Sequence, residues 1–238
     1  MKFEFPTVSN MKVLILLLSL VIFSDAQDAV HTARILYLNG PEEDTGPYYL
    51  FDGAETHEVK LPQLSLSPVV DLRPGSLKLW LLRTPVADVE SVPEGTPFVL
   101  VPADIRDFYL ICLIDPTNRV IPIRMQLVNA NTESIGRGEM LWFNLTAKPL
   151  AGTVGSRTLR LEAQATTLVQ EPATGNKDYP IELYFRVEGD DRTHPLIESQ
   201  WRHDPRSRSL VFVFDEGKRR APRVMAFWDF RMPKEKKE

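Results

Sequence analysis

The chain has 238 residues, of which 43% are hydrophobic and 25% are charged, so it is long enough for one large or two ordinary globular domains with a real core. The formal net charge of -4 argues against a nucleic-acid-binding protein, because such proteins present a basic face to the phosphates. The single cysteine, Cys112, cannot form an internal disulfide, and its apolar neighbours predict a buried thiol rather than a nucleophile.

Residues 1–26 have the pattern of a secretory signal peptide. A lysine precedes the apolar run at 13–23, and the small residues Ser24 and Ala26 follow it at positions -3 and -1 of a cleavage site. The run is too short to span a bilayer comfortably, although an uncleaved anchor is the alternative and Met11 is an alternative start. We therefore predict a periplasmic or secreted protein with no transmembrane segment after signal cleavage.

After the signal peptide, the sequence is a series of short apolar runs bounded by Gly, Pro, Asn and Asp, which is typical of strands. Many runs alternate with period two, as Leu77, Leu79 and Leu81 do, and this pattern predicts strands with one buried face. Proline borders strands because it cannot donate to the ladder, and the chain has 19 prolines. The predicted strand regions are 33–40, 47–53, 57–72, 75–82, 97–102, 107–115, 123–130, 139–146, 157–169, 179–187, 209–216 and 223–230.

The chain also contains an internal similarity. A shift of 100 residues places 110–129 on 210–229 without a gap and gives five identities, where chance gives about one. We therefore predict an all-β fold with two tandem immunoglobulin-like antiparallel β-sandwich domains. The first domain would span 27–120 and the second 121–232, with a charged tail at 233–238. The alternative is that short strands resemble one another by composition alone.

The sequence offers little support for catalysis. It has no metal-binding histidine spacing, no nucleophile elbow and no phosphate-binding loop, so we predict no catalytic residue, no metal and no cofactor. The pair His203-Asp204 has the composition of a turn, because Asp204 can accept a hydrogen bond from the backbone ahead and Pro205 presets φ. A hydrolase that uses carboxylate or His-Asp chemistry is the alternative.

The four tryptophans allow two interpretations. Large aromatic side chains fill the space between sheets or an interface, but exposed ones can also stack on sugar rings. The alternation of side chains places Trp80 and Trp142 opposite their leucine neighbours, so either can be exposed or can lie at an interface. The candidate binding residues are Trp142, Trp201, His203, Asp204, Arg206 and Trp228.

The stretches 139–146, 201–214 and 221–231, together with the signal peptide, resemble uncharacterised exported β-sandwich proteins of Gram-negative environmental bacteria. The resemblance covers most of the mature chain and implies no activity. We predict a non-catalytic binding or structural protein of the periplasm or cell surface that contacts protein or polysaccharide. The alternatives are a carbohydrate-binding module that uses exposed tryptophans and a hydrolase.

The solvent exposure of the tryptophans, of the His203-Asp204 pair and of the sheet edges would distinguish these functions. Two coplanar tryptophans on an open face would favour a sugar ligand. A cleft that joins His203, Asp204 and a second acid would favour an enzyme. A bare sheet edge would favour capture of a partner strand.

Overall fold

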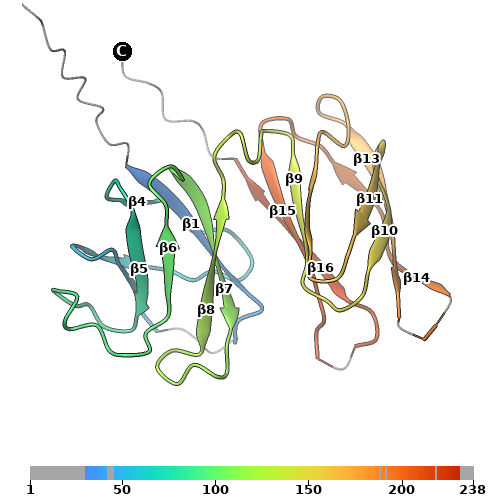
Figure 1. The fold of residues 1–238 in the computed structure, drawn as a ribbon. Coiled ribbons are helices and arrows are strands. Elements are labelled where there is room, and N and C mark those ends of the chain that lie inside the picture. The colour runs from blue at the N-terminus through green and yellow to red at the C-terminus, as the bar shows by residue number, and fades with distance from the viewer. Residues whose placement is uncertain (1–29, 42–45, 188, 191, 218, 231–238) are drawn as a thin grey trace, which may run out of the picture.

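A computed structural model gives the fold (Figure 1). It describes residues 30–41, 46–187, 189–190, 192–217 and 219–230. The predicted signal peptide and the predicted charged tail lie outside the described residues. Every regular element in the described ranges is a strand, which confirms the all-β prediction there, and no helix in these ranges is long and apolar enough to cross a membrane.

The first eight strands form two four-stranded sheets, which we call sheets A and B. Sheet A has the order β4-β1-β7-β8, with the bounds Val70–Leu72, His31–Leu38, Asp107–Ile114 and Ile123–Asn129. Sheet B has the order β3-β2-β5-β6, with the bounds Thr56–Val59, Tyr48–Phe51, Leu77–Leu82 and Phe98–Val101. We refer to β1–β8 as the first half.

Strands β9–β16, the second half, form sheets C and D in the same orders, with every strand number raised by eight. Sheet C has the order β12-β9-β15-β16, with the bounds Thr166–Val169, Met140–Asn144, Arg208–Phe214 and Arg223–Asp229. Sheet D has the order β11-β10-β13-β14, with the bounds Arg157–Leu161, Leu150–Val154, Asp178–Arg186 and Thr193–Arg202. The 100-residue shift thus places β7 and β8 on β15 and β16, which hold equivalent positions in their sheets.

Two features of the pairing differ from the predictions. The sheets are mixed rather than purely antiparallel, because β1 pairs with β7 and β9 pairs with β15 in parallel. Parallel neighbours need a long crossover, and five strands lie between the two members of each pair. In addition, the predicted boundary between residues 120 and 121 falls inside the β7–β8 hairpin, whereas the change from the first pair of sheets to the second lies between β8 and β9.

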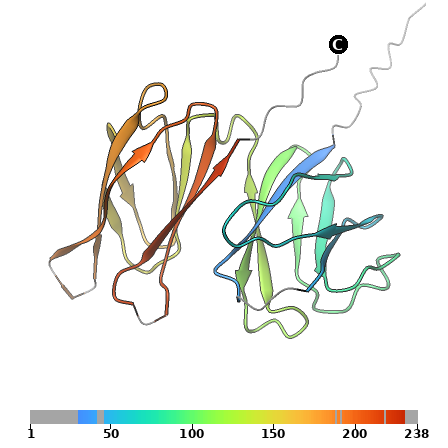
Figure 2. The same ribbon diagram turned by 180° about the vertical axis from the view of Figure 1, so that it is seen from behind.

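The four sheets stack in the order B, A, C, D, so that sheets A and C face each other in the middle (Figures 1 and 2). One cluster of buried side chains lies between each neighbouring pair of sheets. Along β7, for example, Leu110 and Cys112 face sheet B, whereas Tyr109 and Ile111 face sheet C. Burial on both faces explains why this strand is an almost unbroken apolar run.

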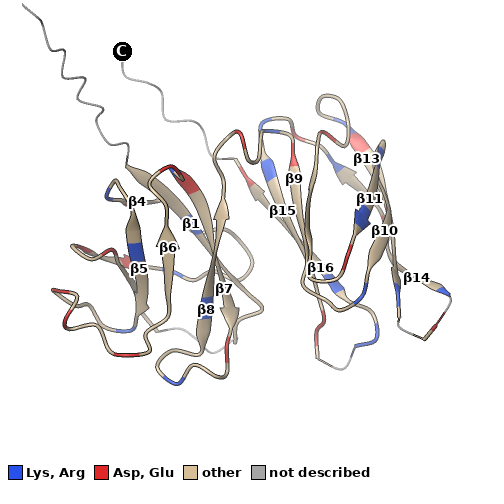
Figure 3. Cartoon of the chain, in the orientation of Figure 1, with Lys and Arg blue, Asp and Glu red and all other residues tan. Residues whose placement is uncertain are grey.

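A polar network joins sheets A and C at one end of their interface. The buried carboxylate of Asp229 accepts hydrogen bonds from Arg34 Nη1 at 2.6 Å and from the Tyr109 hydroxyl at 2.6 Å. Arg208 lies 3.7 Å from the same carboxylate and 2.9 Å from Asp107. Burial raises the pKa of the Tyr109 hydroxyl, which therefore donates to Asp229. Elsewhere the facing strands of these two sheets carry few charges (Figure 3), and buried apolar side chains fill the interface.

The sequence-based assignment missed two strands, β10 and β14. In β10, Gly152 interrupts the apolar pattern, because a Cβ at this position would meet the carbonyl oxygen of Glu182 in β13. Only glycine permits so close an approach of the two backbones. Strand β14 was missed for a different reason, because it is polar and exposed along most of its length.

Candidate functional site

One edge of sheet D is formed by β14, the longest strand in the described part of the chain, with ten residues. It pairs only with β13 and lies at the outer side of the molecule in both views (Figures 1 and 2). The other edge strands, which are β3, β4, β6, β8, β11, β12 and β16, have three to seven residues. Strand β14 is therefore an unusually long edge.

The strand register shows which backbone groups of β14 are free. The Pro180 carbonyl accepts a hydrogen bond from the Gly155 amide, so Pro180 turns its backbone groups towards β10. Its opposite residue on β14 is Gln200, whose amide and carbonyl must then face away from β13. By alternation, Glu198 and Arg202 face the same way. We call this row of outward backbone groups, from 198 to 202, the β14 edge.

An aromatic cleft of about 520 Å³ lies at the C-terminal end of the β14 edge. Its lining combines three aromatic side chains with planar polar ones: Asn176, Gln200, Trp201, Arg202, Asp204, Trp228 and Phe230. Trp228 is 48% exposed and Phe230 is 55% exposed. Apolar surface of this kind, next to hydrogen-bonding groups, is typical of a binding site.

The predicted tryptophans meet at this cleft, but they do not form a flat platform. Trp142 is fully buried and stacks on Trp201, with ring centroids 6.0 Å apart and planes 12° apart. Trp201 in turn contacts Trp228 at 6.5 Å, with the two planes tilted by 56°. The coplanar pair therefore lies inward, and the pair that reaches the surface forms a corner. The Trp142 indole N–H has no hydrogen-bond partner among the described residues, so its contribution is packing.

His203 is a structural residue. It is buried, its Nδ1 lies 2.7 Å from the Gly175 carbonyl oxygen, and its Nε2 lies 3.0 Å from the Gly138 carbonyl oxygen. Both ring nitrogens lie against backbone carbonyl oxygens inside the fold, a position typical of a structural histidine rather than of a general base or a metal ligand.

The first half has a similar junction, which His31 closes. Its ring nitrogens lie 2.7 Å from the Ile105 carbonyl oxygen and 2.6 Å from the Gly75 carbonyl oxygen. In the first half, the histidine joins the start of β1, the turn after β4 and the loop before β7. In the second half, it joins the start of β9, the turn after β12 and the loop before β15, which are the equivalent places. His31 stands on the first strand, whereas His203 stands on the loop. This correspondence supports a structural role for both residues.

Asp204 forms the turn that its sequence context predicts. Its Oδ1 accepts hydrogen bonds from the backbone amide of Arg206 at 2.9 Å and from Arg206 Nε at 3.0 Å, and its Oδ2 accepts one from Arg206 Nη2 at 2.8 Å. The side chain of Arg206, followed by its backbone amide, lowers the pKa of this carboxyl to about 2. Asp204 is therefore an anion held by its own loop, and it lacks the raised pKa of a general acid.

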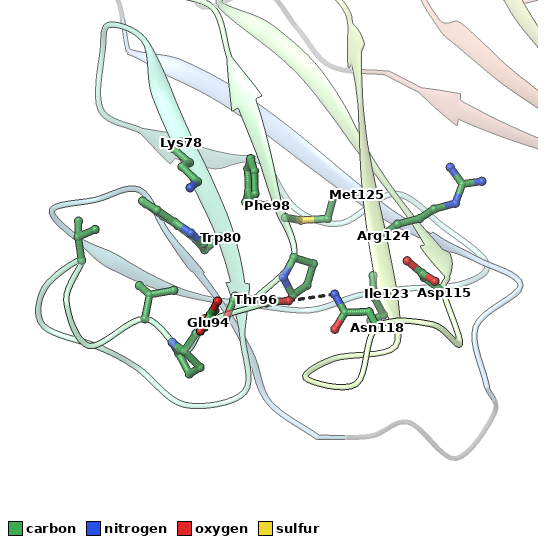
Figure 4. Close-up of a pocket in the computed structure, with 15 residues that line it drawn as sticks. Lys78, Trp80, Glu94, Thr96, Phe98, Asp115, Asn118, Ile123, Arg124 and Met125 are labelled. Atoms are coloured by element: carbon green, nitrogen blue, oxygen red, sulfur yellow. Dashed lines mark hydrogen bonds between the residues drawn. The ribbon is translucent and has the colours of Figure 1, made fainter.

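A second pocket, of about 560 Å³, lies on the first half, where β5 and β6 approach β8 (Figure 4). The Lys78 ammonium lies 4.0 Å from the ring centroid of Phe98 and 4.8 Å from that of Trp80. Trp80 is almost fully buried beneath the loop that connects β5 to β6, and Arg124 stands on the opposite wall. A charged side chain therefore already covers the aromatic faces in this pocket.

The structure gathers the predicted binding residues at one end of the second half. Trp201, Asp204 and Trp228 line the cleft, Arg206 holds Asp204, and Trp142 and His203 lie behind them. Sequence reasoning missed Asn176, Gln200, Arg202 and Phe230. A signal for Gln200 was its place in the segment that precedes the predicted turn, but its exposure depends on the strand order.

The functional interpretation of this site rests on its geometry, because two comparisons with known proteins gave no match. No protein-family model and no curated protein matches the chain. Within the described ranges, no group of three or more His, Cys, Asp or Glu side chains is arranged to hold a metal ion. The β14 edge and the rings of the aromatic cleft lie together at one end of sheet D.

Proposed function

We propose that the protein is an exported, non-catalytic binding protein of the periplasm or cell surface, built from two tandem immunoglobulin-like domains. Its function is to capture an extended protein strand along the β14 edge. The aromatic cleft beside this edge receives apolar side chains of the captured strand. The resemblance to exported β-sandwich proteins and the signal-peptide pattern at residues 1–26 support export.

The observation that carries this proposal is the free backbone of β14. Proteins normally shorten, charge or cover their edge strands, because unpaired N–H and C=O groups pair with other chains. In this protein the longest strand lies at an edge, and none of the hydrogen bonds of the described residues uses the outward groups of 198–202. Addition of a strand would satisfy these groups through main-chain hydrogen bonds, and side-chain pockets would provide specificity.

Polysaccharide binding is the second candidate. The half-exposed rings of Trp228 and Phe230 favour it, since they stand beside the planar polar side chains of Asn176 and Gln200. Against it, Trp201 and Trp228 touch each other with tilted planes, so they offer one corner and no row of sugar-stacking faces. A hydrolase finds less support, because His203 is engaged on both nitrogens.

The test uses the mature protein as bait in an extract of its own envelope, with a glycan array beside it. We expect capture of a polypeptide that Gln200→Pro abolishes, because proline blocks an outward amide. The control Tyr184→Ala, which removes an exposed aromatic ring from the same half, should leave capture intact. Glycan binding that Trp228→Ala abolishes and Gln200→Pro spares would overturn the proposal in favour of the polysaccharide.

A further inference from the structure

We infer that the strand captured by the β14 edge is β14 of a second copy of this chain. The two strands run antiparallel about a two-fold axis at Gln200, and they join two four-stranded D sheets into one continuous sheet. This inference rests on the proposed function, because it names the partner of the same edge.

Pro195 limits how much of β14 can pair. It lies opposite Tyr184, on the far side of a register shift, and the alternation there turns its backbone outward. Proline has no amide hydrogen, so it blunts the N-terminal part of the edge. C-terminal to Pro195, the outward residues of β14 that can both donate and accept are Glu198, Gln200 and Arg202. Gln200 is the midpoint of these three, which makes it the natural centre of a symmetric pair.

The charges favour the same centre. A two-fold axis at Gln200 places Glu198 of each copy opposite Arg202 of the other, which makes two cross-strand ion pairs. An axis at Glu198 would instead place two glutamates face to face. An axis at Ser199 would place Glu198 opposite Gln200 and would leave the charges without partners. Only the Gln200 register is complementary to itself, as a two-fold interface must be.

Within the described part of the chain, Glu198 has no cationic partner. Its cross-strand neighbour on β13 is Glu182, another exposed acid, and like charges in this position destabilise a sheet. No ion pair of the described residues includes either glutamate, whereas Arg202 already lies 3.4 Å from Asp178. The second copy's Arg202 would supply the missing positive charge at Glu198.

The inner face of β14 also fits a partner strand. In the Gln200 register, Trp201 lies opposite the second copy's Ser199, which is small enough to lie beside an indole ring. The added strand would extend sheet D beneath the aromatic cleft and would cover the half-exposed rings of Trp228 and Phe230. Burial of large aromatic side chains next to an Arg is typical of the energetic centre of an interface.

Cross-linking tests the register directly. Directly opposite residues in an antiparallel pair have Cα atoms about 4.5–5.5 Å apart, a spacing that permits a disulfide. We expect Gln200→Cys to form an intermolecular disulfide dimer on mild oxidation. The matched control, Glu198→Cys, lies on the same strand and face, but it is opposite Arg202 and should not cross-link. The native Cys112 is buried and cannot interfere.

A charge exchange tests the ion pairs in solution. Sedimentation should show that Glu198→Arg weakens self-association by about tenfold or more, and that adding Arg202→Glu in the same chain restores it. Circular dichroism should show an unchanged fold in both variants. Equal cross-linking at 198 and 200, or a wild-type protein that stays monomeric at all concentrations, would overturn the second copy as partner.

The two proposals can fail separately. If the wild-type protein is monomeric but still captures an envelope polypeptide, and Gln200→Pro abolishes that capture, then the proposed function stands with a different partner. If the β14 variants change neither self-association nor capture, both proposals are wrong.

Discussion

Strands β6 and β14 hold the same position in the two halves, at the edge of the outer sheet next to the fifth strand of each half. Their surroundings differ. β6 has four residues and runs beside β8 of the neighbouring sheet, whereas β14 has ten residues and, in the described ranges, makes no comparable contact with β16. The same strand order therefore leads to a closed edge in the first half and an open edge in the second.

The side chains differ in the same sense. In the first half, Phe98 and Leu100 are exposed on β6, but the ammonium of Lys78 lies over the Phe98 ring (Figure 4). Lys78 stands on β5, the neighbour of the edge strand, and an added strand beside β6 would approach its charge and desolvate it. In the second half, none of the cation–π contacts among the described residues involves the ring of Trp228 or Phe230. The comparison indicates that protection of an edge depends on its length and its flanking charges more than on topology.

The substitution with the largest expected effect tests whether the open β14 edge depends on the docking of the two halves. Asp229→Asn removes the buried charge that accepts hydrogen bonds from Arg34 and Tyr109. We expect the free energy of unfolding to fall by about 3–5 kcal/mol, because the arginine is left near an uncharged partner. Urea unfolding measures this change, and the exposed control Asp104→Asn should cost less than about 0.5 kcal/mol.

Hydrogen exchange on the same Asp229→Asn variant then sharpens the comparison. The β14 edge results from strand pairing within sheet D and does not depend on sheet A. The outward amides of 198–202 should therefore exchange as fast as in the wild type. Slower exchange there would mean that docking of the halves, and not the strand itself, leaves the edge open.

Two neighbouring prolines test the assignment of backbone directions on β14. Ser199→Pro should destabilise the protein by about 3 kcal/mol or more, because the Ser199 amide faces β13 opposite Ile181. Gln200→Pro should cost less than about 1 kcal/mol, because its amide faces outward. Thermal or urea unfolding of the two variants gives the comparison, and equal destabilisation would contradict the register argument.

The closed edge can be opened by one substitution. Lys78→Ala removes the ammonium over Phe98 and Trp80, and with it a cation–π contact worth about 0.5–1 kcal/mol. We expect a small loss of stability together with new concentration-dependent association through β6. Light scattering measures the association, and Lys60→Ala, an exposed lysine elsewhere in the first half, serves as the control. If Lys78→Ala associated no more than the wild type does, contact with β8 alone would account for the closed edge.

Much of the fold could be predicted from the sequence, because its central strands are apolar on both faces and its outer strands alternate. The regions 107–115 and 209–216 stood out for the first reason, and 75–82 for the second. The parallel pairs β1–β7 and β9–β15 could not be predicted, because pairing between distant segments leaves no local mark. Strand β14 was hidden because an edge strand is polar along most of its length, as Glu198 and Gln200 show.

The candidate site was only partly predictable for the same reason. Trp201 and Trp228 were found because tryptophan is conspicuous in any sequence, and Asp204 because its turn chemistry is local. Gln200 gains its importance from facing a free edge, and Phe230 from standing beside that edge, and both facts depend on the strand order. The sequence alone gives no sign of such a residue, because its role depends on which strand is left unpaired beside it.

The smallest expected effect concerns the turn at the end of the open edge. Arg206 lowers the pKa of the Asp204 carboxyl to about 2, so the contribution of this turn should be complete above about pH 4 and should be lost only as the pH falls towards 2. Because Asp204 and Trp228 line the same cleft, tryptophan fluorescence should report the change. In Arg206→Ala the pKa should return towards its ordinary value, and the fluorescence transition should move to higher pH. An unmoved transition would show that the backbone amide alone holds the carboxylate, and that the Arg206 side chain does not stabilise the end of β14.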